Sequence, residues 1–161
     1  MADDENIVLD ALAPVFLELG KAVYICQIFE SSLCFLLSLL EHEIDNGEEG
    51  VFQEAWNFHS KKPLGQLLDA LRKKIEVPED LKAYILVGID KRNEIVHRSI
   101  ANNIIRLYES TGRIEFEREL VELKNEVKRR DITVNQLIDS LLKKYGLSNT
   151  SLKRDADVRW N

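Results

Sequence analysis

The chain contains few residues that interrupt helices. Among its 161 residues there are only 7 glycines and 3 prolines. An all-β sandwich of this size needs many tight turns, which depend on these two residue types. Hydrophobic residues make up 45% and charged residues 31% of the chain, which is apolar enough to bury a core. The sequence therefore predicts an all-α fold, an up-and-down bundle of about four or five long helices.

Apolar residues recur at helical spacing in several stretches of the chain. We expect the first helix to begin near Asp10 or Pro14 and to continue to about Glu43. The second helix is expected to begin between Ser60 and Pro63. Proline suits the first turn of a helix, because the N–H that it lacks would have no partner there.

The later helices have similar start signals. A third helix is expected to open at Pro78, where acidic residues follow the proline and complement the helix dipole. The last helix is expected to begin at Thr133, because Thr133 and Gln136 form the T-x-x-Q pattern of a capping box, and to end at Gly146. Residues 118–131 fit either a helix or an extended chain.

The remaining segments predict connections. Residues 103–117, NIIRLYESTGRIEFE, contain two β-rich runs around Gly112 and predict one short β-hairpin. Residues 51–63 are expected to be a connector. The length suggests a single domain over residues 1–147, followed by a polar, flexible tail at 148–161.

Charge and hydropathy limit the partners of the chain. The net charge is −6 and the pI is near 5.2, so any RNA contact must come from a local basic patch. The acidic N-terminus, MADDEN, does not resemble a signal peptide. Residues 22–40 have the length of a membrane span, but Glu30 would cost about 2.5–3.5 kcal/mol there. We therefore expect a core helix that also faces a partner subunit, a cytoplasmic location and no membrane partner.

Neither the cysteines nor most of the histidines suggest a cofactor. Cys26 and Cys34 lie about two turns apart within an apolar helix, where reduced core residues are expected rather than a disulfide or a zinc site. The acidic neighbours of His42 alternate around its helix, so no metal site is expected there. His59 is expected at a helix start or at the surface. We expect neither a metal nor another cofactor.

The most informative stretch is IDKRNEIVHRS, residues 89–99. On a wheel of about 100° per residue, Arg92, Asn93 and His97 share one arc with isoleucines and valines. Charged neighbours such as Lys91 and Arg98 point away from this arc. Burying unpaired polar groups costs about 1–3 kcal/mol each, so the three groups either pair in a structural network or perform a function.

The segment RNEIVH matches the pattern R-N-x-x-x-H and resembles the motif of the HEPN domain family. The resemblance extends to a long first helix containing FESSLCFLL, a second helix that opens with PLGQLLDAL, and the motif late in a third helix. It covers roughly residues 10–146. It implies a helical domain that dimerises with its motif helices facing each other, here through the motif helix and the first helix.

Many members of this family are metal-independent endoribonucleases in toxin–antitoxin, phage-defence or RNA-processing systems. The resemblance implies that Arg92 would bind the scissile phosphate, that His97 would act as general base or acid, and that Asn93 would orient one of them. The substrate would be RNA, and an antitoxin or another defence protein would be a partner. Lys91, Arg98 and Arg106 are expected to form a basic, substrate-binding mouth, doubled in a dimer.

Two features weigh against simple transfer of this function. Some family members carry a tyrosine two positions after the histidine, which a partner nucleotidyltransferase modifies. Ser99 occupies that position here, so this regulation is not expected. The acidic charge balance favours the alternative of a non-catalytic dimeric module that binds nucleotide, RNA or a protein. A plain helical interaction protein, with the motif present by coincidence, is a third alternative. An enzyme is the favoured interpretation.

Overall fold

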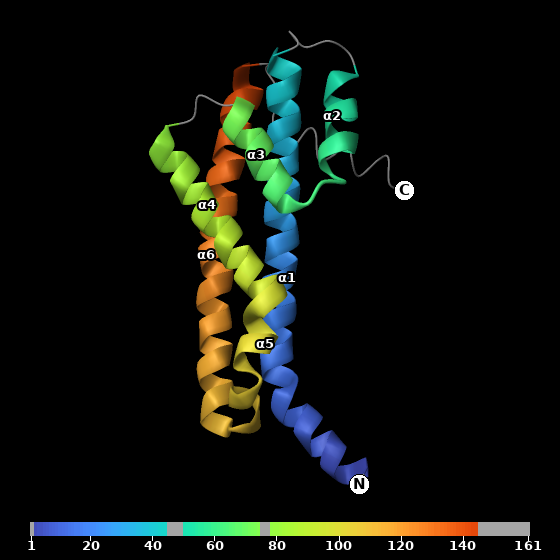
Figure 1. The fold of residues 1–161 in the computed structure, drawn as a ribbon, viewed down its shortest axis with the longest axis vertical. Coiled ribbons are helices and arrows are strands. Elements are labelled where there is room, and N and C mark those ends of the chain that lie inside the picture. Colours follow the sequence, from blue (N-terminus) through green and yellow to red (C-terminus); the bar gives the residue numbers. More distant parts are fainter. Residues whose placement is uncertain (1, 45–49, 75–77, 145–161) are drawn as a thin grey trace. The chain divides into compact units, whose positions relative to one another are not determined.

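The computed structural model describes residues 2–44, 50–74 and 78–144, and within these ranges it contains helices and no strand (Figure 1). The all-α prediction is confirmed. The elements are α1 (Ala2–Ile44), α2 (Val51–His59), α3 (Leu64–Lys74), α4 (Glu79–Asn93), a π-helical turn (Glu94–Arg98), α5 (Ser99–Asn103), a 3-10 turn (Ile105–Tyr108) and α6 (Ser110–Lys144). The long helices α1 and α6 pack together.

The chain divides into two compact units, which we describe separately. The first unit combines residues up to 29 with residues 83–130, and the second combines residues 30–82 with those from 131 onward. The predictions for Gly146 and for the tail at 148–161 lie outside the described residues. The expectation of a single domain stays a prediction.

The first unit has an apolar core shared by α1 and α6. Val15, Phe116 and Leu120 are buried together, and partly buried apolar residues from α1, α5 and the 3-10 turn pack against them. The side chain of Glu18 on α1 accepts a hydrogen bond from Lys124 Nζ on α6 at 2.7 Å. This ion pair lowers the pKa of Glu18 below its usual range. Both apolar and charged contacts therefore join these two helices.

Close packing of α4 in this unit depends on Gly88. A Cβ atom at position 88 would lie 2.9 Å from Cγ of Arg130 and 3.0 Å from Cζ of Phe29. The guanidinium of the buried Arg130 lies 4.3 Å from the ring centre of Tyr84, a cation–π contact. The missing side chain of Gly88 thus lets α4 approach α6 and α1.

The second unit buries mainly leucines. Its buried apolar residues come from the C-terminal part of α1, from α2 and α3, and from the C-terminal part of α6: Leu33, Cys34, Leu36, Leu37, Leu39, Leu40, Ala55, Leu64, Leu67, Val134, Ile138 and Leu142. Phe35 on α1 makes edge-to-face contacts with Phe52 and Trp56 on α2. Nε2 of His59 lies 2.9 Å from Oε1 of Glu41. Aromatic and polar contacts therefore hold α2 against α1.

Several sequence-based boundaries were wrong. The hairpin over 103–117 does not form: the 3-10 turn and the start of α6 occupy this segment, and the ambiguous residues 118–131 are helical. Phe116, Leu120, Val127 and Val134 lie on one helical face and are buried, and burial outweighs β propensity. No helix begins at Thr133, because α6 continues through it.

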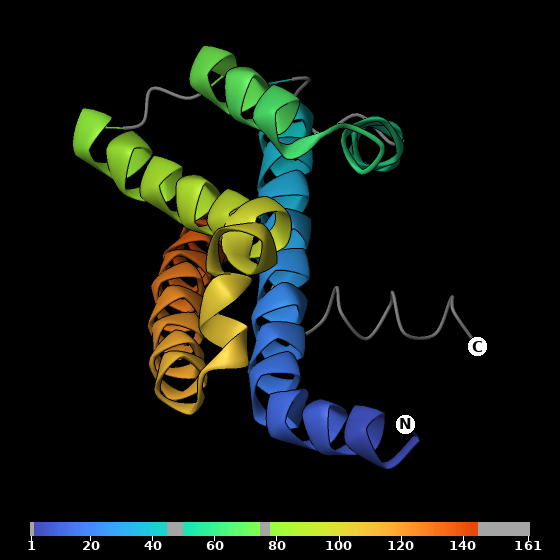
Figure 2. The same ribbon diagram turned by 60° about the horizontal axis from the view of Figure 1, so that its bottom comes forward.

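Corrections also apply to α1 and α2. Helix α1 begins at Ala2, so Pro14 lies inside it rather than in its first turn. The helix changes direction in its N-terminal part (Figures 1 and 2), and a proline inside a helix is an ordinary cause of such a bend. The predicted connector at 51–63 contains α2. His59 ends α2 and is only 1% exposed, so the surface position expected for it was wrong.

Among the described residues, one stretch is long and apolar enough to cross a membrane by length and composition. It lies within Val8–His42 on α1, and 56% of its most apolar 18-residue segment is buried. A core helix of a soluble protein has the same composition, so this feature alone does not assign the helix to a membrane. The cytoplasmic location stays a prediction.

Candidate functional site

The three motif residues lie where a regular helix gives way to a π-helical turn. Arg92 and Asn93 are the last residues of α4, and His97 lies in the turn Glu94–Arg98. In a regular α-helix, two residues five positions apart point about 140° away from each other. A π-turn bonds each N–H to the carbonyl five residues back, so it inserts an extra residue and brings such a pair onto one side. The wider turn therefore places Arg92 and His97 together.

The side chains of Arg92 and His97 are in direct contact. Nη1 of Arg92 lies 3.1 Å from Nε2 of His97 and donates to Oδ1 of Asn93, also at 3.1 Å. A guanidinium has only donors, so Nε2 of His97 must accept. The contact therefore requires a neutral imidazole that carries its proton on Nδ1. The structure brings the three predicted catalytic residues together.

The π-turn also changes which residues are buried. His97 is exposed, Arg92 and Asn93 are half-buried, and Val96 is 39% exposed. The regular wheel had placed His97 and Val96 on the apolar arc, which was wrong because the extra residue rotates every position after Asn93. The inward positions are taken by Ile95 and Ser99. The motif is consequently a half-exposed cluster rather than a fully buried network.

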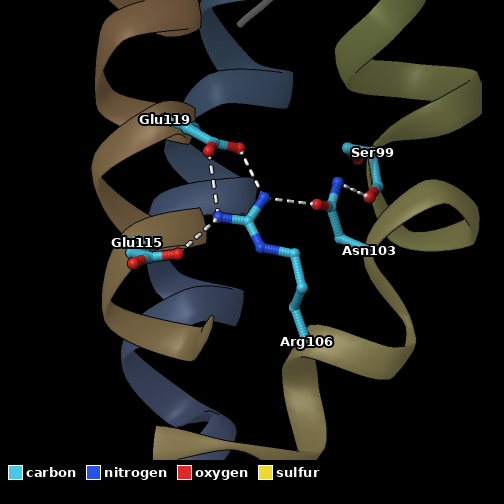
Figure 3. Close-up of polar contacts among 5 residues, drawn as sticks. All are labelled: Ser99, Asn103, Arg106, Glu115 and Glu119. Atoms are coloured by element: carbon cyan, nitrogen blue, oxygen red, sulfur yellow. Dashed lines mark hydrogen bonds and ion pairs between the residues drawn. The ribbon is translucent and has the colours of Figure 1, made fainter. Parts of the chain in front are cut away.

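The expected basic mouth is partly neutralised by carboxylates. Nζ of Lys91 lies 3.2 Å from Oε2 of Glu94. Arg98 is exposed. Arg106, in the 3-10 turn, is 31% exposed and is surrounded by acceptors (Figure 3). Of the three expected substrate-binding cations, two are thus paired with acids.

Arg106 contacts side-chain oxygens of three residues. Its Nη1 donates to Oε2 of Glu119 at 2.8 Å and to Oδ1 of Asn103 at 2.7 Å. Its Nη2 donates to Oε1 of Glu119 at 2.9 Å and to Oε2 of Glu115 at 3.4 Å. The two-pronged ion pair raises the pKa of Arg106 and lowers the pKa of Glu119. The guanidinium is therefore fixed to α6 in this structure (Figure 3).

Sequence reasoning missed the partners that organise this region. Ser99 Oγ donates to the Ile95 carbonyl at 2.6 Å, and Asn103 Nδ2 donates to the Ser99 carbonyl at 2.8 Å. Both bonds join residues four positions apart, a pattern in which a serine or asparagine side chain bonds a backbone carbonyl of the preceding helical turn. The partners Glu115 and Glu119 could not be found in this way, because a hairpin was predicted over residues 103–117 and residues 118–131 fitted either a helix or an extended chain.

The described residues offer little support for other chemistry. No group of three or more His, Cys, Asp or Glu side chains among them is arranged to hold a metal ion. Cys34 is buried, its Sγ lies 3.7 Å from the His59 carbonyl, and burial raises its pKa to about 11. A thiol in this state is a poor nucleophile at neutral pH.

Comparisons with known proteins found no match. No protein family, no curated protein and no solved structure in the three comparisons matches the chain. The assignment of function therefore depends on the geometry of the motif and on the resemblance of RNEIVH to the HEPN motif.

Proposed function

We propose that this protein is a metal-independent endoribonuclease of the HEPN type, in which Arg92 and His97 act directly on RNA. The main support is the 3.1 Å contact between Arg92 Nη1 and His97 Nε2 on a π-turn. Guanidinium groups bind phosphate, and imidazoles transfer protons near neutral pH. π-Turns within α-helices occur frequently at functional sites. The two groups that cleavage of a phosphodiester requires lie side by side.

In the proposed reaction, Nε2 of His97 accepts the proton of the RNA 2′-OH, and the 2′ oxygen attacks the adjacent phosphorus. The bond between phosphorus and the 5′ oxygen breaks, which leaves a 2′,3′-cyclic phosphate and a 5′-OH end. The His97 imidazole of a second copy of the chain, in its protonated imidazolium form, donates a proton to the leaving 5′ oxygen and becomes neutral. Arg92 stabilises the negative charge that develops on the phosphate, and Asn93 orients the guanidinium.

The resting contact suggests how substrate activates the base. In the free protein, Arg92 donates to the lone pair of Nε2 that would take up the proton. A phosphate forms charge-assisted, two-pronged hydrogen bonds with a guanidinium, and these are stronger than a bond to neutral imidazole. Bound RNA would therefore draw Arg92 from His97 and free Nε2 as a base.

A homodimer through the motif helix and α1 is part of the proposal, because the second proton donor comes from a second copy. Exposed apolar side chains on α1, α4 and the π-turn support it: Val8, Leu9, Phe16, Leu17, Tyr24, Val87 and Val96. Clusters of exposed apolar residues are typical of protein interfaces. Sedimentation of the purified protein is expected to give twice the mass of the chain.

The test is RNA cleavage by purified wild-type and variant proteins in the presence of a chelator. We expect Arg92→Ala and His97→Ala each to lower the cleavage rate by about 10²–10⁴-fold. His97→Gln keeps an acceptor for Arg92 but cannot transfer a proton, so it should remain inactive. Arg118→Ala, which removes an exposed arginine of α6, is the matched control and should cleave normally. Wild-type levels of cleavage by the His97 variants would refute the proposal.

A non-catalytic binding module is the second candidate. The pairing of Lys91 with Glu94, and of Arg106 with Glu115 and Glu119, favours it, because these pairs reduce the local positive charge. In this case His97→Ala would lower the melting temperature, and the wild-type protein would never cleave RNA. The cleavage assay with a parallel melting curve separates the two candidates.

A further inference from the structure

A series of hydrogen bonds extends from the π-turn to α6. The Ser99 hydroxyl donates to the Ile95 carbonyl inside the turn, the Asn103 amide donates to the backbone carbonyl of Ser99, and Arg106 donates to the Asn103 side-chain oxygen. The last member of this series of hydrogen bonds is Arg106, which forms a two-pronged ion pair with Glu119 (Figure 3). Every member belongs to the first unit.

The first link compensates for the irregular backbone. In a regular α-helix, the N–H of Ser99 would bond the Ile95 carbonyl four residues back, whereas a π-turn shifts the partner to five residues back. The Ser99 hydroxyl donates to the Ile95 carbonyl at 2.6 Å and is buried. The backbone of Arg98, directly before Ser99, has a φ of −124°, away from helical values. Ser99 therefore supplies a donor where the helical pattern is broken.

The far end of this series is a group of polar contacts around Arg106. Arg106 makes four contacts with oxygens of Asn103, Glu115 and Glu119, within 2.7–3.4 Å. A Cβ atom at Gly112, in the first turn of α6, would lie 2.5 Å from the Arg106 carbonyl oxygen. The glycine thus lets the backbone at Arg106 approach the first turn of α6, close to Glu115 and Glu119.

We propose that Ser99, Asn103, Arg106 and Glu119 are positioning residues that hold the π-turn, and with it the contact between Arg92 and His97. This inference rests on the proposed function for its consequence in catalysis, but the contact can be measured without RNA. It assigns Arg106 to the support of the site, rather than to binding of substrate phosphate as the sequence suggested. Misplacement of reacting groups by about 1 Å costs up to about a hundredfold in rate.

The first experiment measures the imidazole nitrogens of His97 by NMR in the full-length protein, without RNA. In wild type, Nε2 should give the signal of an unprotonated acceptor and Nδ1 that of a protonated nitrogen. Ser99→Ala should shift both signals toward a mixture of tautomers, because the turn loses its added donor, while Ser99→Thr keeps the hydroxyl and should retain them. Glu119→Gln, a change at a half-exposed side chain, should produce the same shift if Ser99→Ala fails to fold.

The second experiment separates positioning from phosphate binding. In cleavage assays, Ser99→Ala and Glu119→Gln should lower kcat by about tenfold to a hundredfold with little change in KM. Binding of a labelled single-stranded RNA by Arg106→Gln should keep the salt dependence of wild type. A lost phosphate contact would instead reduce the slope of log K against log salt by about 0.7.

The outcomes are distinct for the two proposals. Unchanged His97 signals in both Ser99→Ala and Glu119→Gln would overturn the positioning role, and so would a reduced salt slope in Arg106→Gln. If wild type never cleaves RNA, the proposed function fails, but the NMR signals of the variants still support or overturn the positioning role. Shifted signals that Ser99→Thr restores would support it.

Discussion

Replacing Gly112 by alanine is expected to destabilise the protein, although alanine is the better helix former. The added Cβ would lie 2.5 Å from the Arg106 carbonyl oxygen and 3.0 Å from its Cα, both backbone atoms that cannot rotate away. Such overpacking costs about 1–3 kcal/mol. The gain in helix propensity is at most about 1 kcal/mol and is smaller in the first turn of α6. The net loss should be about 1–2 kcal/mol.

A loss of this size is measurable by thermal unfolding followed by circular dichroism. For a chain of this length, 1 kcal/mol shifts Tm by about 2–4 °C, so Gly112→Ala should lower Tm by about 2–8 °C. Gly20→Ala is the control: position 20 lies within α1, and a Cβ there meets nothing within 4 Å. That variant should gain up to about 1 kcal/mol. A Tm of Gly112→Ala equal to or above that of wild type would refute the close approach at Arg106.

Three further predictions follow from contacts elsewhere in the structure. Gly88→Ala should destabilise the protein by up to about 2 kcal/mol, because the new Cβ meets the side chain of Arg130. Gly65→Ala in α3 is the control and should not destabilise the protein, because a Cβ there meets nothing within 4 Å. Urea unfolding measures the free energy of unfolding of both variants. The pKa of Glu18 is lower in the folded protein than in the unfolded chain. The ionised Glu18 side chain therefore stabilises the fold at pH values above its pKa in the unfolded chain, and this stabilisation is lost as the pH falls through its pKa in the folded protein. The Tm difference between wild type and Glu18→Gln should therefore shrink between neutral and acidic pH, and a constant difference would contradict it. Cys34, whose pKa is raised to about 11, should react with a thiol reagent only after denaturation, and rapid labelling of the native protein would contradict its burial.

The sequence correctly predicted where two helices begin, because the residues at a helix start largely determine its position. Pro63 directly precedes α3 and Pro78 directly precedes α4, as expected of proline at a helix start. Pro14 does not mark the start of a helix, because the long apolar helix α1 continues through it. Val15 and Ala22 are buried, and their packing offsets the cost of a proline inside a helix.

The region after the motif could not be predicted from local patterns. The runs around Gly112 have β-forming residues, but Phe116 and Leu120 are buried in one core with Val15, about a hundred positions earlier in the chain. Burial against residues so far away in the sequence outweighs the local preference for a β-strand. The same is true of Arg106, which the sequence marked only as one more cation and which the fold pairs with Glu119.

The sequence by itself determined the all-α class and the start positions of α3 and α4, because these depend on helix propensity, capping and spacing, and it named Arg92, Asn93 and His97 as candidate site residues. Only the tertiary structure decided that the helix widens at Glu94–Arg98 and brings Arg92 to His97. A regular wheel cannot show this, because the extra residue of a π-turn is stabilised by contacts beyond its own helix. Ile95 and Ser99 are buried at this turn, and we propose that the ion pair of Arg106 with α6 helps to hold it.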